Sequence, residues 1–278
     1  MNSSNALSWE DAVRQLREEI GNRSLVEACF YDDPLLNAAE RFHTGTEWAA
    51  TRRLLGPVRG AALDIGAGRG IASFALARDG WVVTALEPDP SALVGAGAIH
   101  ALARDSGLAI DVAQTWGEEL PFADAGFALV YCRQVLHHAN DLQQLCREIA
   151  RVLRPGGLML AAREHVISHA ADLQIFLDGH PLHRLYGGEH ACLVQEYEEA
   201  IRASGLALDQ VINSYASDIN LYPLTVADMK RQFLRRMYLP AGLAALIPDV
   251  AVAWAGSRTR APGRLFTFVA HKPMSAAP

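Results

Sequence analysis

The chain has 278 residues, of which half are hydrophobic and 20% are charged. This balance is typical of a globular protein, and the length fits one large α/β domain or a domain with an added cap. The formal net charge of −6 argues against nucleic acid as a partner, because phosphate binding favours a basic surface. No apolar run approaches the roughly 20 residues that cross a bilayer, so we expect no membrane span.

The four cysteines (Cys29, Cys132, Cys146 and Cys192) are scattered along the chain and form no Cys-x-x-Cys pair. A disulfide framework is not expected in a chain this long with so few cysteines. The first ten residues are polar and lack the basic-then-apolar layout of a signal peptide. We therefore expect reduced thiols in a cytoplasmic protein, as a monomer or a homodimer.

The first fifth of the chain has a helical texture. Residues 8–56 are predicted to be helical, with a second helical stretch over about 33–55 that Gly56-Pro57 breaks. After this point short apolar runs alternate with helical patterns, which is the signature of βαβ units and a parallel sheet. We therefore expect a helical cap over residues 1–56 and a main domain over residues 57–278.

The main domain is predicted to be an α/β fold with a doubly wound, mostly parallel, seven-stranded sheet. Two cap insertions are expected in it, one over about 165–192, which is irregular and rich in histidine, and one over about 216–262. The predicted strands are 61–65, 81–86, 108–113, 127–132, 158–163, 206–214 and 264–270, and the predicted helices are 71–79, 90–105, 141–154, 193–204 and 224–256.

A glycine-rich loop follows the first predicted strand. Gly66, Gly68 and Gly70 allow backbone angles that other residues avoid, and they leave the main chain open to a ligand. The next helix points its free N–H groups at the same place, so the loop can hold a carboxylate. Taken alone, the loop is also compatible with a tight turn between a strand and a helix.

Glu87 lies at the carboxyl end of the second predicted strand, 17 residues after Gly70. In doubly wound sheets, ligands bind beyond these strand ends. A carboxylate there can accept hydrogen bonds from both hydroxyls of a ribose. The alternative is a carboxylate that is solvated in a loop.

Five segments in this order resemble the successive motifs of the class I S-adenosylmethionine-dependent methyltransferases. The similarity covers about residues 60–165 and points to the small-molecule branch that includes the ubiquinone and menaquinone C-methyltransferases. Residues 166–262 resemble no substrate class. The five segments are LDIGAGRG (63–70), ALEPDP (85–90), GEELPF (117–122), QVLHHANDL (134–142) and REIARVLRPGGLML (147–160).

The resemblance implies S-adenosyl-L-methionine as the cofactor and a role for each matched position. Trp116 departs from the family, because many members carry an acidic residue there for the adenine amino group, and it could stack on the ring or lie in the core. Asp64, Gly66, Ala67, Gly68 and Gly70 would face the methionine part of the cofactor, Glu87 with Pro88 would hold the ribose, Trp116, Gly117 and Glu118 would lie against the adenine, and Arg133 would lie at the rim of the site.

Three histidines are the candidate catalytic residues. His165 follows the fifth predicted strand, and a histidine with a pKa near ~6.5 can accept a proton at neutral pH. It is the best base candidate, with His137 or His138 second, although these two could instead only cap a helix. The candidate substrate residues are Gln134, Glu164, Tyr186 and His190.

The segment after His165 is rich in residue types that bind metals, namely His169, His180, His183, Glu189 and His190. However, the His180–His183 spacing is not tied to a predicted helix, and methyl transfer needs no metal in most relatives. We therefore expect no metal and interpret the segment as a polar lid over the substrate, with Gly187-Gly188 as its hinge.

The expected function is transfer of a methyl group to a small or medium-sized, partly apolar acceptor, through an oxygen, nitrogen or carbon atom. A nicotinamide-dependent oxidoreductase is one alternative, but the loop has the pattern GxGxG and not the GxGxxG of the dinucleotide fingerprint. A non-catalytic binding module is the other, although it would tend to lose Gly68 or Glu87. The apolar pocket lining is expected from Phe176, Leu182, Tyr186, Tyr215, Tyr222, Met229 and Phe233.

Overall fold

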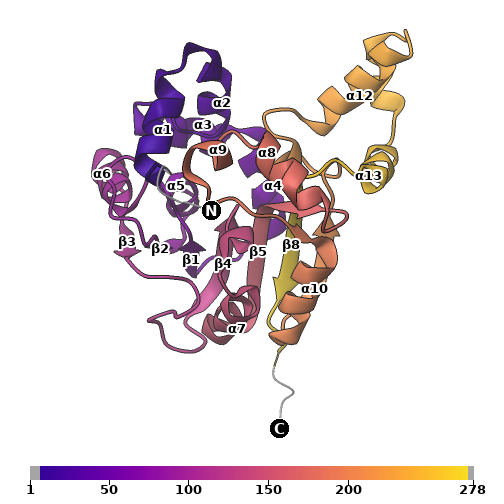
Figure 1. The fold of residues 1–278 in the computed structure, drawn as a ribbon. Helices are drawn as coiled ribbons and strands as arrows, with labels where there is room; N and C mark the ends of the chain where they lie inside the picture. The colour runs from indigo at the N-terminus through magenta and orange to yellow at the C-terminus, as the bar shows by residue number, and fades with distance from the viewer. Residues whose placement is uncertain (1–6, 275–278) are drawn as a thin grey trace.

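The computed structural model describes residues 7–274, apart from the side chain of Ile20. One sheet organises the molecule, with strand order β3-β2-β1-β4-β5-β8-β7 and the two-residue strand β6 (Cys192–Leu193) paired to β5 (Figure 1). All pairs are parallel except the two that β8 makes with β5 and β7. None of the helices in the described range combines the length and apolar character that a membrane crossing requires.

The strands confirm the predicted mostly parallel, seven-stranded α/β sheet, with the very short β6 as an addition. Their bounds are β1 Ala61–Ile65, β2 Val82–Leu86, β3 Ile110–Ala113, β4 Phe127–Arg133, β5 Leu153–Ile167, β7 Ala207–Ile212 and β8 Arg264–His271.

Helices cover both faces of the sheet, as a doubly wound fold requires. Leu129 and Tyr131 of β4 pack on one face against side chains of α3 (Leu35–Thr44), α4 (Thr46–Leu55), α5 (Ile71–Arg78) and α6 (Ala96–Ser106). Val130 and Cys132 point to the other face, against α7 (Leu142–Val152) and α10 (Val194–Ala203). Burial of strands on both faces is typical of parallel sheets.

The N-terminal segment is helical, but the single helix predicted over 33–55 is two helices. Gly45, in extended backbone, ends α3 and precedes α4, because glycine disfavours the helix interior. Two helices and one short 3₁₀ turn come before them: α1 (Trp9–Glu18), η1 (Ile20–Asn22) and α2 (Arg23–Ala28).

Strand β5 extends beyond the predicted 158–163 because β8 pairs along it as far as Val166. His165 therefore lies within the strand and not after it. The segment 165–192, predicted to be irregular, contains α8 (Asp172–Gly179) and α9 (His183–Tyr186). Leu182 and Tyr186 pack against Leu16 and Trp9 of the N-terminal helices, so the two segments meet at the top of Figure 1.

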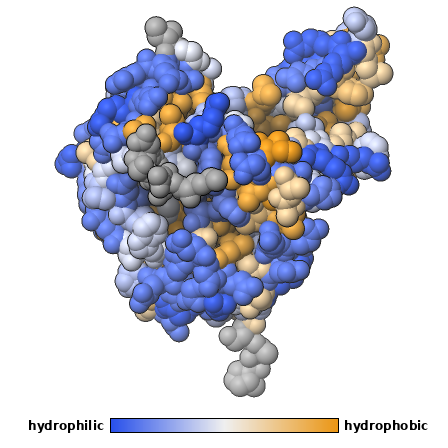
Figure 2. Space-filling view, in the orientation of Figure 1, coloured by the Kyte–Doolittle hydropathy of each residue, from blue (hydrophilic) through white to orange (hydrophobic). Residues whose placement is uncertain are grey.

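Residues 226–258 form an arm that projects from the body at the upper right of Figure 1. Much of its apolar surface is exposed, as the orange patches of Figure 2 show, and Tyr238 is 97% exposed. Phe233 is 56% exposed on this arm and does not line the cavity described below, so the prediction that it lines the pocket is wrong. The elements of the second insertion are α11 (Asp218–Leu221), α12 (Val226–Arg236), η3 (Ala241–Leu246) and α13 (Asp249–Arg258).

Candidate active site

Two glycines of the loop after β1, Gly66 and Gly68, are needed for different structural reasons. A Cβ added at Gly66 would lie 2.6 Å from Cγ2 of Val135, and the residue has a φ of +63°. A Cβ at Gly68, with a φ of +54°, would meet only the carbonyl oxygen of Val94 at 3.9 Å. Gly66 is therefore required by packing, whereas Gly68 keeps the main chain open toward the neighbouring cavity.

Glu87 joins the end of β2 to this loop. One oxygen of its carboxylate accepts the backbone N–H of Gly68 at 2.7 Å, and the other accepts the N–H of Asp89 at 3.0 Å. Burial raises the pKa of Glu87, and these two N–H groups oppose the shift. The carboxylate is thus fixed at the carboxyl edge of the sheet, where it lines the cavity.

Asp64 is almost fully buried in β1 and accepts the hydroxyl of Ser73 at 2.6 Å. Burial raises the pKa of Asp64 to about 7, against the lowering effect of the Ser73 hydrogen bond. The carboxyl group therefore holds its proton to a higher pH than an exposed aspartate does.

A cavity of about 570 Å³ runs from the glycine loop to a group of histidines. This volume lies within the range of roughly 300–1,000 Å³ that is typical of small-molecule sites. Of the predicted cofactor residues, all line the cavity except Gly70, whose Cβ position faces Ile99. Trp116 is 64% exposed at the rim, which excludes the alternative that it lies in the core.

Arg133 lines the cavity but its charge is neutralised by Glu47 of α4. The Nε and Nη2 atoms of Arg133 donate to the Glu47 carboxylate at 2.6 and 3.0 Å. Glu47 is completely buried, and Arg163 lies 3.7 Å from it. Glu47 was not predicted as part of the site, because a single glutamate in a helix carries no signal for a buried partner.

N-terminal residues close one side of the cavity, which the sequence analysis also missed. Trp9, Phe30 and Tyr31 line it. Arg69, inside the glycine loop, donates to the carbonyl oxygens of Phe30 and Asp32 at 2.9 and 3.0 Å. The Arg69 side chain therefore ties the glycine loop to the backbone of the segment between α2 and α3.

The far end of the cavity is built around histidines from three segments. His137 and His138 lie in η2 (Leu136–His138) and His165 in β5, and all three line the cavity. Glu164, predicted to contact substrate, does not line it. Instead it accepts the backbone N–H of Val135 at 3.1 Å and pairs with Nδ1 of His137 at 2.6 Å.

Two further residues complete this end, Glu189 and His180, and both line the cavity. The sequence analysis placed them only within a histidine-rich segment. Tyr186 and Gln134, predicted to contact substrate, also line the cavity, whereas His190 is exposed and does not. Gln134 has a φ of +58° and accepts a hydrogen bond from Arg133 at 3.1 Å.

Burial keeps this end of the cavity largely uncharged. It lowers the pKa of His137 and of His165 well below the ordinary value, and it lowers the pKa of His180 to about 4. Burial also raises the pKa of Glu189 to about 7. The imidazoles are therefore neutral at neutral pH, with lone pairs available to a ligand.

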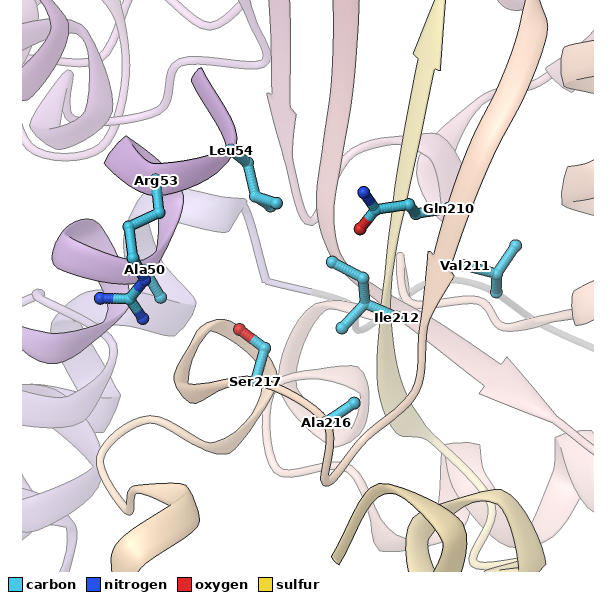
Figure 3. Close-up of a pocket in the computed structure, with 8 residues that line it drawn as sticks. All are labelled: Ala50, Arg53, Leu54, Gln210, Val211, Ile212, Ala216 and Ser217. Carbon is cyan, nitrogen blue, oxygen red and sulfur yellow. The ribbon is translucent and has the colours of Figure 1, made fainter. Parts of the chain in front are cut away.

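A second hollow of about 520 Å³ lies on another part of the molecule (Figure 3). It is formed by Ala50, Arg53 and Leu54 of α4 and by β7 with the loop that follows it. No buried acid or histidine lines it, so it offers no comparable chemistry.

Comparison with known proteins points to one family. Residues 63–161 match the family model described as a methyltransferase domain. The chain is 35% identical over 150 residues to a ubiquinone biosynthesis O-methyltransferase of Rhizobium leguminosarum, covering 52% of this chain and 58% of the relative. It is 31% identical over 171 residues to the protein of the same description from Rhizobium rhizogenes, covering 61% of this chain and 66% of the relative. The chain thus spans about three fifths of the length of these relatives.

Solved structures support the fold. The geranyl diphosphate C-methyltransferase of Streptomyces coelicolor aligns with a TM-score of 0.59 at 14% identity, covering 97% of this chain and all of that chain. The cyclase SpnF aligns with a TM-score of 0.58 at 20% identity, covering 86% of this chain and 82% of that chain. Since proteins described by different reactions share this architecture, the fold alone does not define the chemistry.

Proposed function

Because the chain belongs to the class I S-adenosylmethionine-dependent methyltransferases, we propose that it transfers a methyl group to a small or medium-sized, partly apolar acceptor. The observation that carries the proposal is the single cavity that joins the glycine loop and Glu87 to a polar, histidine-lined end. One end suits the methyl donor, and the other leaves room for an acceptor.

The residues of the first end fit S-adenosylmethionine. The backbone at Gly68 is open toward the cavity, so the loop can hold the carboxylate of the methionine part. Glu87 is fixed by the N–H groups of Gly68 and Asp89, and its carboxylate can also accept the hydroxyls of the ribose. Trp116 offers an exposed ring to the adenine.

When bound, S-adenosylmethionine supplies a methyl group that its sulfonium has already activated. The work left to this chain is to align the acceptor and to exclude water. Trp9, Phe30 and Tyr31 provide an apolar wall for this purpose. We propose that residues of the N-terminal segment up to 56 act as the cap of the domain that follows, with the 165–192 insertion beside them.

We propose that the acceptor binds at the histidine-lined end, in contact with His137, His138 and His165. Gln134 and Tyr186 line the same part of the cavity. The volume and the mixed apolar and polar lining support a small organic acceptor over a macromolecule. The cytoplasmic location, the lack of a nucleic acid partner and the choice between monomer and homodimer stay predictions.

Neither alternative gains support. The comparisons reported above contain no nicotinamide-dependent oxidoreductase, and both Gly68 and Glu87, which a non-catalytic module would tend to lose, line the cavity.

The proposal is tested by calorimetric titration of the purified chain with S-adenosylhomocysteine and, separately, with NAD⁺. We expect S-adenosylhomocysteine to bind at one site per chain and NAD⁺ not to bind. Transfer of labelled methyl from S-adenosylmethionine to a panel of phenolic and amine acceptors then tests catalysis. Binding of NAD⁺ without S-adenosylhomocysteine would overturn the cofactor assignment.

The predicted role of His165 has its own test. Its Nδ1 lies 2.8 Å from the carbonyl oxygen of Gly263, which leaves Nε2 for the cavity. We expect His165→Gln to lower the turnover with any acceptor found, while the affinity for S-adenosylhomocysteine stays unchanged. An unchanged turnover would remove His165 from the reaction.

A further inference from the structure

His137 has one ring nitrogen in use and one that is unused. Its Nδ1 lies 2.6 Å from the Glu164 carboxylate and donates its hydrogen there, because an ionised carboxylate can only accept. Its Nε2 therefore carries the lone pair. That atom is buried and has no hydrogen-bond partner among the described residues. Unpaired buried polar atoms are uncommon and call for a ligand, a water or an ion.

His165 repeats this arrangement. Its Nδ1 donates to the Gly263 carbonyl oxygen at 2.8 Å, so its Nε2 also carries a lone pair. Metal-binding histidines almost always donate their second N–H to a carboxylate or a backbone carbonyl, which fixes the ring and its tautomer. His137 donates to a carboxylate and His165 donates to a backbone carbonyl, so each ring is fixed in one of these two ways.

Glu189 supplies a carboxylate to the same place. Only 8% of the residue is exposed, and its side chain accepts no hydrogen bond from the part of the chain that the structure describes. Its oxygens instead face three imidazoles, at 3.8 Å from Nε2 of His137, 3.8 Å from Nε2 of His138 and 3.9 Å from Nδ1 of His180. A buried carboxylate without donors is costly unless a cation accompanies it.

We propose that His137, His165 and Glu189 bind a divalent first-row transition metal ion, with Zn²⁺ as the simplest occupant. One ligand atom from each lies within 4.8 Å of the other two. Two histidines and one glutamate, with an open fourth position, form a donor set that catalytic zinc sites use. The site goes beyond methyl transfer as such and departs from the expectation, drawn from the sequence, that no metal binds.

The geometry requires a small contraction on binding. In a tetrahedral site, ligands at ~2.0–2.1 Å from the zinc ion lie about 3.3–3.4 Å from each other, so atoms that are now up to 4.8 Å apart have to close by at most about 1.5 Å. Glu189 is the ligand free to make that movement, because it lies in a loop two residues after Gly187, whose φ is +82°. His165 is held in β5 and His137 by Glu164, so these two define the site.

The position of the metal site suits it to bind the methyl acceptor. All three ligands line the cavity that begins at the glycine loop, so the open coordination position faces the space assigned to the acceptor. The assignment of this space to the acceptor rests on the proposed function. A metal ion there would bind an oxygen atom of the acceptor and lower the pKa of a hydroxyl, which removes the need for a free histidine base. The acceptor class is then a hydroxylated compound.

The test measures metal binding without any methyl transfer. Chain lacking a polyhistidine tag is treated with chelator, dialysed, and titrated with Zn²⁺ in a calorimeter and with Co²⁺ in a spectrophotometer. We expect one Zn²⁺ per chain and a visible absorption band for the Co²⁺ form. Glu189→Gln and His165→Gln should each weaken Zn²⁺ binding at least about tenfold, because each loses one of three ligands.

His169→Gln is the matched control, since His169 is exposed in the same segment and does not line the cavity. It should bind Zn²⁺ like the wild type. Melting temperature and S-adenosylhomocysteine affinity show whether each variant is folded, and His165→Gln decides if Glu189→Gln does not fold. Absence of Zn²⁺ binding by the wild type, or wild-type Zn²⁺ affinity in both ligand variants, would overturn the metal site. Either result with intact S-adenosylhomocysteine binding leaves the methyltransferase proposal standing.

Discussion

The carboxylate of Glu87 accepts the backbone N–H of Gly68 at 2.7 Å, which joins the end of β2 to the loop after β1. Because both lie at the carboxyl edge of the sheet, the two elements that the sequence connects to the cofactor are one unit in space. The acid and the loop are pre-arranged before any ligand binds. Changes to the Glu87 carboxylate should therefore affect ligand affinity more than stability.

Glu87→Gln is expected to weaken S-adenosylhomocysteine binding by about 10- to 100-fold, since hydrogen bonds to a charged group contribute about 1.5–3 kcal/mol each. The amide keeps the shape of the side chain but loses the charge. Calorimetric titration measures the effect. Glu119→Gln, which changes an exposed acid outside the cavity, should leave the affinity unchanged. Equal affinities for Glu87→Gln and the wild type would show that Glu87 does not hold the ligand.

The two loop glycines should respond differently to alanine. Gly66→Ala places a Cβ 2.6 Å from Val135 and should lower the melting temperature more than Gly68→Ala, whose Cβ meets only an atom at 3.9 Å. Both changes carry the cost of alanine at positive φ, of the order of 1 kcal/mol. Adding Val135→Ala to Gly66→Ala should restore part of the lost stability. No recovery in that double variant, measured by thermal unfolding, would contradict the packing explanation.

The sheet and the end of the cavity that is formed by the glycine loop and Glu87 were predictable, because their sequence signals are local. Strands β1 and β4 show short apolar runs, and the glycine loop follows β1 directly. Glu87 needed only the position of the next strand end. Such features depend on a few neighbouring residues and on the regular order of a parallel sheet.

The histidine-lined end of the cavity and the buried pairs around it depend on contacts between distant parts of the chain. Glu47 meets Arg133 across 86 positions, and the cavity end that contains His137 is completed by Glu189. No spacing rule connects such pairs. The extension of β5 as far as Val166 likewise results from pairing with β8, which lies about a hundred residues later. The sequence therefore indicated which residue types were present, but not which of them would meet.

The buried pair of Glu47 and Arg133 makes a strong prediction about stability. Glu47→Gln removes the counter-charge and leaves Arg133, with Arg163 nearby, uncompensated in the interior. Breaking a buried pair in this way costs about 3–5 kcal/mol. Urea unfolding measures the change. Glu198→Gln, which removes the half-buried partner of the exposed Arg202, should change stability by less than about 1 kcal/mol. Similar losses for the two variants would refute the assignment of Glu47 as a buried anchor.

Because burial raises the pKa of Asp64, we expect the stability of the chain to depend on pH. Burial raises its pKa from 3.8 to about 7 in the folded chain, so between these values the folded state binds more protons than the unfolded state. The contribution of Asp64 to the free energy of unfolding is fully present below pH 3.8 and is lost as the pH rises toward 7. Above pH 7 this contribution does not change further. One pKa unit corresponds to about 1.4 kcal/mol, so the loss amounts to a few kcal/mol at most.

Asp64→Asn should remove this dependence, because the amide keeps a partner for Ser73 but cannot ionise. The free energy of unfolding in urea, measured at pH 5, 6, 7 and 8, should therefore increase for the variant relative to the wild type as pH rises. The comparison must be a difference between the two chains, since Glu189 also has a pKa raised to about 7 and contributes the same slope to both. A constant difference from pH 5 to pH 8 would mean that Asp64 stays ionised in the folded chain throughout this range.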